Sequence, residues 1–179
     1  ECSSLNTVTI PNSVIAIENS VFYGCTSLCS VVISEGVTTM GNWTFCNCKR
    51  LTSVIIPNSI TKIGESVFWR CESLTTVILP DSLDIIDDGA FMCCYGLKKI
   101  KIPDSVTSIG PRAFSCCRNL QSIIIPDNVS QIGHAAFNDC NGLQRVVIGK
   151  GLTYMGSDAF KGCTGELFVK CIMPHSQFH

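Results

Sequence analysis

The sequence predicts a solenoid, a fold in which short repeats stack in one direction, and three columns of residues carry that prediction. A leucine, a phenylalanine and a cysteine each recur every 23 residues along the 179-residue chain. A period of about 20 to 50 residues, kept without slippage, is typical of repeats that stack because none buries its apolar face alone. The columns are Leu5, Leu28, Leu51, Leu74, Leu97, Leu120 and Leu143; Phe22, Phe45, Phe68, Phe91, Phe114, Phe137 and Phe160; and Cys2, Cys25, Cys48, Cys71, Cys94, Cys117, Cys140 and Cys163.

Composition narrows the classes of protein to which the chain can belong. It is 46% hydrophobic and 15% charged, and its formal net charge is -1. A chain so close to neutral has no overall electrostatic attraction for nucleic acid, so we expect no nucleic-acid partner. No stretch approaches the roughly 18 uninterrupted apolar residues of a membrane-spanning helix, so we expect no membrane span in this segment.

The first element of each repeat is predicted to be a short strand. In the repeat that begins at Leu51, the β-branched residues Val54 and Ile56 lie two positions apart. This period of two is typical of a strand that buries one face. A proline follows at 57, and likewise at 11, 80, 103 and 126. Proline ends the strand because it has no N–H group to donate to a neighbour.

The remainder of each repeat is predicted to contain an extended arm and then a turn. Ile60 and Ile63 lie three residues apart, and such a pair is too short for a helix, so a tight extended arm or a narrow turn is expected. The glycine that follows, Gly64 in this repeat, permits a sharp bend. Phe68 and Cys71 are again three residues apart, which predicts one helical or 3-10 turn with both side chains facing inward.

The complete repeat resembles a known family. The pattern Leu-x-x-Val-x-Ile-Pro-x-Ser-Val-x-x-Ile-Gly-x-x-Ala-Phe-x-x-Cys is similar to the BspA-like, or Treponema-type, leucine-rich repeat. The resemblance covers residues 5–165 as seven full repeats, so that a leucine-rich repeat domain spans residues 1–165 with a partial repeat at 1–4. Residues 166–179 are interpreted as an atypical C-terminal repeat or cap, because terminal repeats must cover an exposed end of the stack.

The resemblance implies both a fold and a biological setting. The implied fold is a right-handed, curved leucine-rich-repeat solenoid, with a parallel sheet on its concave side and short turns or 3-10 segments on its convex side. The implied setting is the cell surface or the secreted fraction, where such proteins serve in adhesion or bind host proteins. The resemblance brings no catalytic residues.

A polar column falls where leucine-rich repeats usually place an inward asparagine. Because a buried polar group must be satisfied, we expect these side chains to hydrogen-bond the backbone of neighbouring turns. The pair Asp87-Asp88 replaces a glycine and its neighbour in a different column, and we interpret it as surface variation. The polar column contains Ser13, Ser59, Ser82, Ser105 and Asn128.

The 13 cysteines invite an interpretation in terms of thiol or metal chemistry. Eight lie in the repeat column, where a free cysteine behaves as a small buried hydrophobe. Cys93 and Cys116 share another offset in adjacent repeats. Stacked turns are about 4.8 Å apart and a disulfide tolerates a Cα separation of about 4.4–6.8 Å, so a disulfide between them is feasible in an exported protein. Cys171, His175 and His179 have a spacing that could hold zinc, but we expect a mobile tail there and no metal site.

No set of residues predicts an active site. A nucleophile requires a positioned base, and no motif fixes one, so we expect neither enzymatic activity nor a cofactor. Asp81, Asp104 and Asp127 form a column after the prolines, but Pro-Asp-Ser is a good turn sequence, and this favours a turn over a calcium site. Asn42 begins the sequon Asn-Trp-Thr and is a candidate N-glycosylation site for a secreted eukaryotic protein.

Function is therefore predicted to lie on the concave face of the sheet. The strand residues that alternate with the buried ones form an apolar stripe, interrupted by a basic patch at Lys98, Lys99 and Lys101. Strand propensity alone explains isoleucine and valine on a sheet, whereas contiguous exposed apolar area usually marks an interface. The candidate binding residues are Val32, Ile55, Ile78, Lys99, Lys101, Ile124, Arg145 and Val147.

Two functions of different classes remain open at this point. The first is a non-enzymatic extracellular or cell-surface adhesion and recognition module, which binds an extracellular or host protein through the concave sheet. The alternative is a structural protein that assembles with copies of itself into a dimer or filament through the Ile/Val stripe. Light scattering over a series of concentrations distinguishes the two, because only self-assembly makes the particle grow with concentration.

Overall fold

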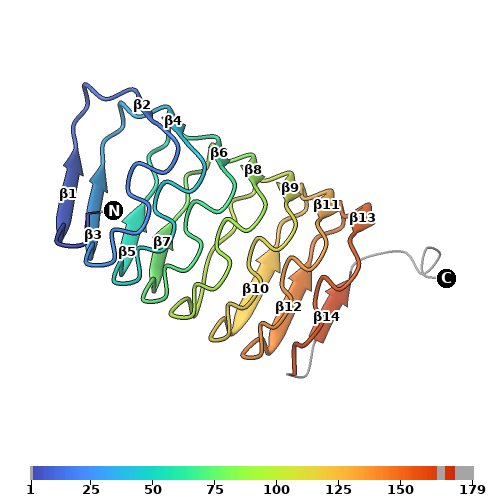
Figure 1. Cartoon of the computed structure of the whole chain (residues 1–179). Helices are drawn as coiled ribbons and strands as arrows, with labels where there is room; N and C mark the ends of the chain where they lie inside the picture. Colours follow the sequence, from blue (N-terminus) through green and yellow to red (C-terminus); the bar gives the residue numbers. More distant parts are fainter. Residues whose placement is uncertain (1, 165–167, 172–179) are drawn as a thin grey trace.

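The computed structural model describes residues 2–164 and 168–171, and it is a stack of β-strand turns (Figure 1). Within each sheet of the first row, a residue pairs in parallel with the residue 23 positions later, as Thr7 does with Ser30 and Ser53 with Thr76. The predicted solenoid and the predicted strand at Val-x-Ile are thus confirmed. The first row consists of β1 (Thr7–Ile10), β3 (Ser30–Ile33), β5 (Ser53–Ile55), β7 (Thr76–Ile78), β10 (Ser122–Ile125), β12 (Arg145–Ile148) and β14 (Phe168–Cys171).

The first row is divided into two sheets. One contains β1, β3, β5 and β7, and the other contains β10, β12 and β14. Between them, residues 99–101 occupy the strand position of their turn, but within the described chain this turn keeps a single isolated bridge, from Lys99 to Ser122. The predicted row of strands is therefore interrupted at the lysine-containing turn.

A second row of parallel strands forms from the extended arms. These strands are two residues long and pair with the same 23-residue offset, as Ile63 does with Ile86. The sequence predicted an extended arm at this position, and the structure shows that the arms join into sheets. The second row consists of β2 (Ala16–Ile17), β4 (Thr39–Met40), β6 (Lys62–Ile63), β8 (Ile85–Ile86), β9 (Ser108–Ile109), β11 (Gln131–Ile132) and β13 (Tyr154–Met155).

The segment around each phenylalanine consists of turns. The single helical or 3-10 turn expected around Phe68 does not form, and the described residues contain no helix. Ser66 and Arg70 have φ angles of 53° and 59°, in the left-handed region that interrupts a helix. Their N–H groups donate to the carbonyls of Asp88 and Met92 in the next turn, at 2.9 Å in each case. The backbone is thus hydrogen-bonded from turn to turn here as well.

Stacked phenylalanine rings form the centre of the core. Consecutive rings from Phe22 to Phe160 are nearly parallel, with centroids 5.1 to 5.7 Å apart and interplanar angles of 3° to 11°. Offset stacking at this separation is a favourable arrangement for aromatic pairs. Each inner ring contacts its equivalents in both neighbouring turns, so the repeat unit also serves as the unit of packing. The fully buried rings are Phe45, Phe68, Phe91, Phe114 and Phe137.

The cysteine column contributes hydrogen bonds as well as apolar volume. The carbonyl oxygen of Phe45 accepts the N–H of Cys48 in its own turn at 3.2 Å, and it also accepts the thiol of Cys71 from the next turn at 3.2 Å. A carbonyl has two lone pairs, and both are therefore used. The same bond joins Cys94 to the carbonyl of Phe68 at 3.2 Å. The interpretation of these cysteines as small buried hydrophobes omitted this bond.

The hydrogen bonds of the predicted polar ladder form at Ser82, Ser105 and Asn128, but the expected burial is wrong, because Ser82 and Asn128 are exposed. Ser82 donates to the carbonyls of Asn58 at 2.7 Å and Ile60 at 3.0 Å. Ser105 donates to Leu83 O at 2.6 Å. The Asn128 amide donates to Asp104 O at 2.7 Å. Each polar side chain thus satisfies a backbone carbonyl of the preceding turn.

The predicted cap at 166–179 falls mostly outside the described residues. Within it only β14 is described, and this strand pairs in parallel with β12 from Arg145 and Phe168 to Ile148 and Cys171. The stack of strands therefore continues past residue 165. His175 and His179 of the Cys-His-His spacing lie outside the described part of the chain.

Candidate binding face

The exposed face of the first row, here called the stripe face, contains all eight candidate binding residues. Alternation along the strands places them there, because Val54 and Ile56 are buried whereas Ile55 between them is 62% exposed. Lys99, Lys101 and Arg145 are exposed, and Val147 is half-buried. The large exposed aliphatic side chains of this face are Val32, Ile55, Ile78 and Ile124.

On the stripe face, apolar residues of adjacent strands lie side by side within each sheet. Ile55 is the direct partner of Ile78 in the pairing of β5 with β7. Ile124 is the direct partner of Val147 in the pairing of β10 with β12. Residues paired in this way lie one strand spacing apart, about 4.8 Å. The stripe therefore consists of two apolar patches, with Lys101 between them in the repeat column.

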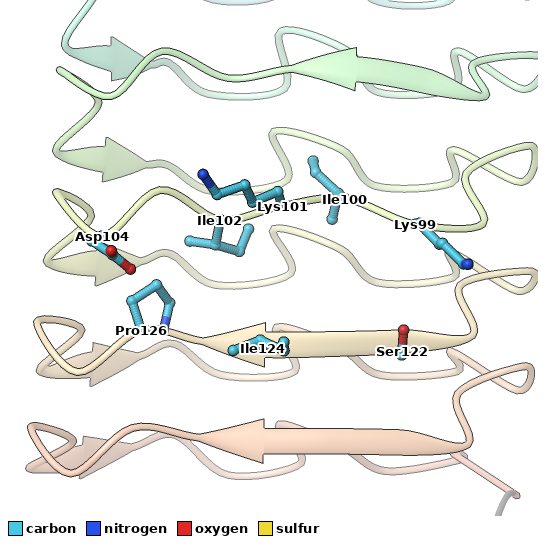
Figure 2. Close-up of a pocket in the computed structure, with 8 residues that line it drawn as sticks. All are labelled: Lys99, Ile100, Lys101, Ile102, Asp104, Ser122, Ile124 and Pro126. Carbon is cyan, nitrogen blue, oxygen red and sulfur yellow. The ribbon is translucent and has the colours of Figure 1, made fainter.

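Three shallow grooves follow the edge of this face. The groove beside the lysine turn has a volume of about 340 Å³ and is lined by Lys99, Lys101, Asp104 and Ile124, among others (Figure 2). A second groove, of about 420 Å³, continues past Ile124 to Asp127. The third, of about 440 Å³, lies over Ile55 and Ile78 and is also lined by Glu35, Asp81 and Lys101.

A row of carboxylates borders the grooves. The sequence alone did not place these residues beside the binding face. These residues share one repeat column, two positions past the end of the buried strand residues, and all are exposed. Asp127 lies 3.9 Å from the Lys150 ammonium. The 23-residue spacing already showed that these residues stack, but it did not show that they lie next to the stripe. The row, here called the acidic edge, contains Glu35, Asp81, Asp104 and Asp127.

Cys93 and Cys116 lie in adjacent turns, as predicted, and both are free thiols in the structure. The N–H of Cys93 donates to the carbonyl of Ser115, the residue before Cys116, at 2.8 Å. Burial raises the pKa of the Cys93 thiol. The disulfide between them stays a prediction.

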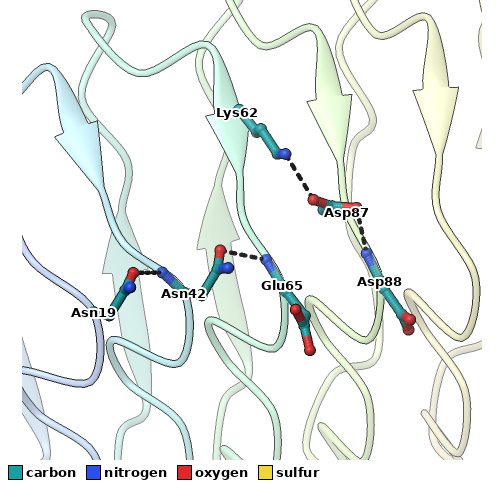
Figure 3. Close-up of polar contacts among 6 residues, drawn as sticks. All are labelled: Asn19, Asn42, Lys62, Glu65, Asp87 and Asp88. Atoms are coloured by element: carbon teal, nitrogen blue, oxygen red, sulfur yellow. Dashed lines mark hydrogen bonds and ion pairs between the residues drawn. The ribbon is translucent and has the colours of Figure 1, made fainter.

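Asn42, the candidate glycosylation site, is half-buried and is part of a chain of amide contacts (Figure 3). Its N–H donates to the side-chain oxygen of Asn19 at 2.8 Å, and its own side-chain oxygen accepts the N–H of Glu65 at 3.0 Å. Thr44, the third residue of the sequon, is buried and donates to Gly41 O at 2.6 Å. Glycosylation of Asn42 stays a prediction.

The Asp87-Asp88 pair, interpreted from sequence as surface variation, connects three turns. Asp87 lies 2.7 Å from the Lys62 ammonium of the preceding turn, and its other oxygen accepts the N–H of Asp88 at 2.9 Å (Figure 3). Asp88 accepts two hydrogen bonds from the Arg112 guanidinium of the next turn, at 2.7 and 3.2 Å. This pair thus has a structural role that the sequence interpretation missed.

Among the described residues, no group of three or more histidine, cysteine, aspartate or glutamate side chains is arranged to hold a metal ion. In the same part of the chain, no helix has the length and apolar character needed to cross a bilayer.

A parallel β-solenoid with a leucine at the start of seven successive turns defines a leucine-rich-repeat protein, a class that generally mediates protein interactions and is typically non-enzymatic. The chain belongs to the BspA type leucine rich repeat family, whose model matches residues 1–115 and 62–171 with six copies. The family resemblance inferred from the repeat pattern is thereby confirmed. No protein with a curated description matches the chain.

Solved structures of bacterial leucine-rich-repeat proteins share this fold. The Treponema pallidum leucine-rich repeat protein has a TM-score of 0.82 and 29% identity, over 88% of this chain and 76% of its own. A leucine-rich repeat protein from Bacteroides ovatus has a TM-score of 0.80 and 27% identity, over 89% of this chain and 50% of its own. A leucine rich cell surface protein from Faecalibacterium prausnitzii has a TM-score of 0.70 and 26% identity, over 98% of this chain and 62% of its own. The chain thus spans only half to about three quarters of these proteins.

Proposed function

We propose that this protein is an adhesion or recognition module that acts outside the cell, secreted or at the cell surface, and binds an extracellular protein through the stripe face. The observation that carries the proposal is the exposure of Ile55, Ile78 and Ile124, which is 62%, 52% and 63%. Contiguous exposed apolar side chains usually mark an interface. The cell-surface description of the similar Faecalibacterium prausnitzii protein supports the proposed location.

The stripe face also has the anatomy of a recognition surface. Its apolar residues form two patches, which Lys101 separates and which charged residues border at Lys99, Arg145 and the acidic edge. Apolar area with a polar border is the usual arrangement in protein interfaces. The residues on either side of the exposed isoleucines are buried, as Val54 and Ile56 are beside Ile55. The core therefore anchors the backbone of this face, which lowers the conformational entropy lost when a partner binds.

The cysteine content is compatible with export. Burial raises the pKa of Cys71, Cys94 and Cys117 well above that of a free thiol, and of Cys46 to about 11. The thiolate is the reactive species, so these side chains exchange disulfides slowly while the protein is folded. A folded module should therefore retain these buried thiols in an oxidising environment.

The test is the triple substitution Ile55→Thr, Ile78→Thr, Ile124→Thr. Threonine keeps the β-branching that suits a strand but removes apolar contact area. We expect the free energy of unfolding to change by no more than about 0.5 kcal/mol per site. Attachment of protein-coated beads to cultured cells should fall sharply, to near the level of uncoated beads.

A matched control removes exposed apolar side chains outside the first row. Ile15→Thr together with Val21→Thr changes residues that are 66% and 50% exposed, and attachment should persist. If the stripe variant folds and its beads still attach like those of the parent, the stripe face is not the interface. If it unfolds instead, these isoleucines belong to the core.

Self-assembly is the second candidate function, and the mixed charge of the stripe face favours it specifically. A two-fold interface must be complementary to itself, and this face carries lysines at 99 and 101 beside the acidic edge. If the protein assembles through this face, the mass of the parent protein measured by light scattering should rise with concentration. The mass of the triple variant should stay that of a monomer. A parent protein that stays monomeric at all concentrations excludes this candidate.

A further inference from the structure

We propose that the lysine turn, defined by Lys98, Lys99 and Lys101, determines which partner the stripe face accepts. The partner is a protein with an extended segment that places an acidic side chain between two apolar ones. The acidic residue pairs with Lys99 and Lys101, and the apolar residues contact Ile78 on one side and Ile124 on the other. This inference rests on the proposed function and identifies the chemistry of its partner.

The lysine turn separates the two sheets of the first row, although β3 and β5 within one of these sheets also pair at only one position, Ser30 with Ser53. β5 and β7 pair at three positions, and β10 and β12 pair at four. At the lysine turn, the pairing with the following strand consists of the isolated bridge from Lys99 to Ser122. Ile100 and Ile102 remain 8% and 4% exposed, so the core still anchors the turn. The groove of about 340 Å³ lies at this interruption.

The charges of this turn lack partners within the described protein. Salt bridges in the described residues involve Lys49, Lys62, Arg112, Lys150 and Lys161. The lysines at 98, 99 and 101 form none, and all three are exposed. In the column of Lys101 the turns from Thr9 to Val147 otherwise have Thr, Val or Ile, and a second lysine, Lys170, follows in the last strand. In the column of Lys99 the other turns from Thr7 to Ser122 have Ser or Thr. These cations therefore remain available to an external carboxylate.

The spacing of these side chains suits an extended segment. Lys99 and Lys101 lie two residues apart and face the same side, which in an extended chain corresponds to about 6.6 Å. Ile78 and Ile124 flank Lys101 in the same column, one turn before it and one turn after it. A carboxylate over the lysines is therefore bordered by aliphatic groups, which exclude water and strengthen a charge-assisted bond.

The acidic edge favours a protein over a polyanion as the partner. Asp104 lines the same groove as Lys99 and Lys101 (Figure 2). Asp81 and Glu35 line the groove on the other side of Lys101. A sulfated polysaccharide or a nucleic acid lying along the grooves would face these carboxylates and be repelled. A peptide segment with isolated acidic residues avoids that repulsion and gains contact with the isoleucines.

The experiment compares charge-reversed proteins on an array of randomised octapeptides. Labelled parent protein should select peptides with Asp or Glu flanked by Ile, Val or Leu. The double variant Lys99→Glu, Lys101→Glu should bind those peptides at least about tenfold more weakly, a change of about 1.4 kcal/mol, and should select Lys or Arg at the central position instead. The control variant Lys49→Glu, Lys161→Glu reverses two exposed lysines outside the stripe face and should select as the parent does.

The outcomes separate this inference from the proposed function. The lysine turn has no role in selection if the parent protein selects no peptides, or if the charge-reversed variant selects the same peptides as the parent. The proposed function survives either result if the triple isoleucine variant still abolishes cell attachment. Dextran sulfate serves as the polyanion probe. Tighter binding of dextran sulfate than of the selected peptides, lost on charge reversal, would overturn the peptide assignment in favour of a polyanion.

Discussion

The column of core phenylalanines and the column of exposed residues that includes Ile55, here called the stripe column, repeat with the same period. The phenylalanine column keeps one residue type along the chain, whereas the stripe column does not. The first contains phenylalanine in all seven turns. The second contains Thr9, Val32, Ile55, Ile78, Lys101, Ile124, Val147 and Lys170. The difference follows from what each side chain contacts. An inner ring packs between two copies of itself, so a change in one turn creates a mismatch with both neighbours.

The stripe column is free of that constraint. Its side chains project away from the core, and exposures of 52% to 63% at Ile78, Ile55 and Ile124 show that the fold does not require their apolar area. Only the strand preference for β-branched residues acts on them. Within a solenoid, therefore, columns of identical residues carry the packing between turns, whereas an exposed column varies from turn to turn without a mismatch in the core.

The largest effect that tests this comparison is expected at Phe68. Its ring is fully buried and lies 5.7 Å from Phe45 and 5.3 Å from Phe91. Phe68→Ala leaves a cavity and breaks two stacking contacts, so it should cost about 3–5 kcal/mol. Urea unfolding measures this loss, and the adjoining turns should lose protection from hydrogen exchange because stability is shared between neighbouring turns.

The control for Phe68→Ala lies in the same turn. Ile55→Ala removes an exposed aliphatic side chain from the stripe face and should change the free energy of unfolding by no more than about 0.5 kcal/mol. A loss below about 1 kcal/mol for Phe68→Ala, or equal losses for the two substitutions, would mean that the phenylalanine column does not hold the turns together.

The second-largest effect on the free energy of unfolding is expected from a disulfide between Cys93 and Cys116. Oxidation of these thiols closes a loop of about 23 residues and should raise the free energy of unfolding by about 3 kcal/mol in the chain-entropy description. Non-reducing peptide mapping of secreted protein should find the two residues linked, and reduction should lower the midpoint of urea unfolding. The variant Cys93→Ser should lose this redox dependence. Free thiols at both positions in secreted, folded material would exclude the disulfide.

The strands and the polar ladder could be predicted because the sequence carries local signals for them. Val54 and Ile56 alternate, and Pro57 marks the strand end, so the register followed from the pattern. The same register placed Ile55 outside, which identified the stripe face. Ser82 and Ser105 recur in one column after the proline, and their hydroxyls bond the backbone of the preceding turn although Ser82 is exposed. Each of these conclusions needed only one turn and its repetition.

The features that the sequence did not reveal depend on contacts between turns. The left-handed residues Ser66 and Arg70 are not glycines, so they gave no signal against a helical turn. The thiol bond from Cys71 to Phe45 O spans 26 residues, and an apolar environment alone accounts for a buried cysteine. The interrupted pairing at Lys99 depends on how adjacent turns align. The repeat period brings such residues close without showing which atoms bond.

The smallest effect is expected at Asp87. Partial burial tends to raise the pKa of Asp87, but the hydrogen bond and charge of Lys62 and the N–H of Asp88 together hold this pKa below its usual value. A carboxylate with a lowered pKa in the folded state contributes stability above its unfolded pKa of about 3.9, and this contribution is lost as the pH falls through the folded value. The ion pair is partly exposed, so its contribution at pH 7 should be below about 1 kcal/mol.

The substitution Asp87→Asn isolates this charge, because asparagine keeps an oxygen that accepts the N–H of Asp88. Urea unfolding should show Asp87→Asn less stable than the parent at pH 7, and the difference should shrink as the pH falls below about 4 or as salt screens the pair. Asp104→Asn is the control, since Asp104 forms no salt bridge within the described residues and should show no such pH dependence. A difference between Asp87→Asn and the parent that stays constant from pH 7 to pH 3 would show that the ion pair with Lys62 does not stabilise the stack.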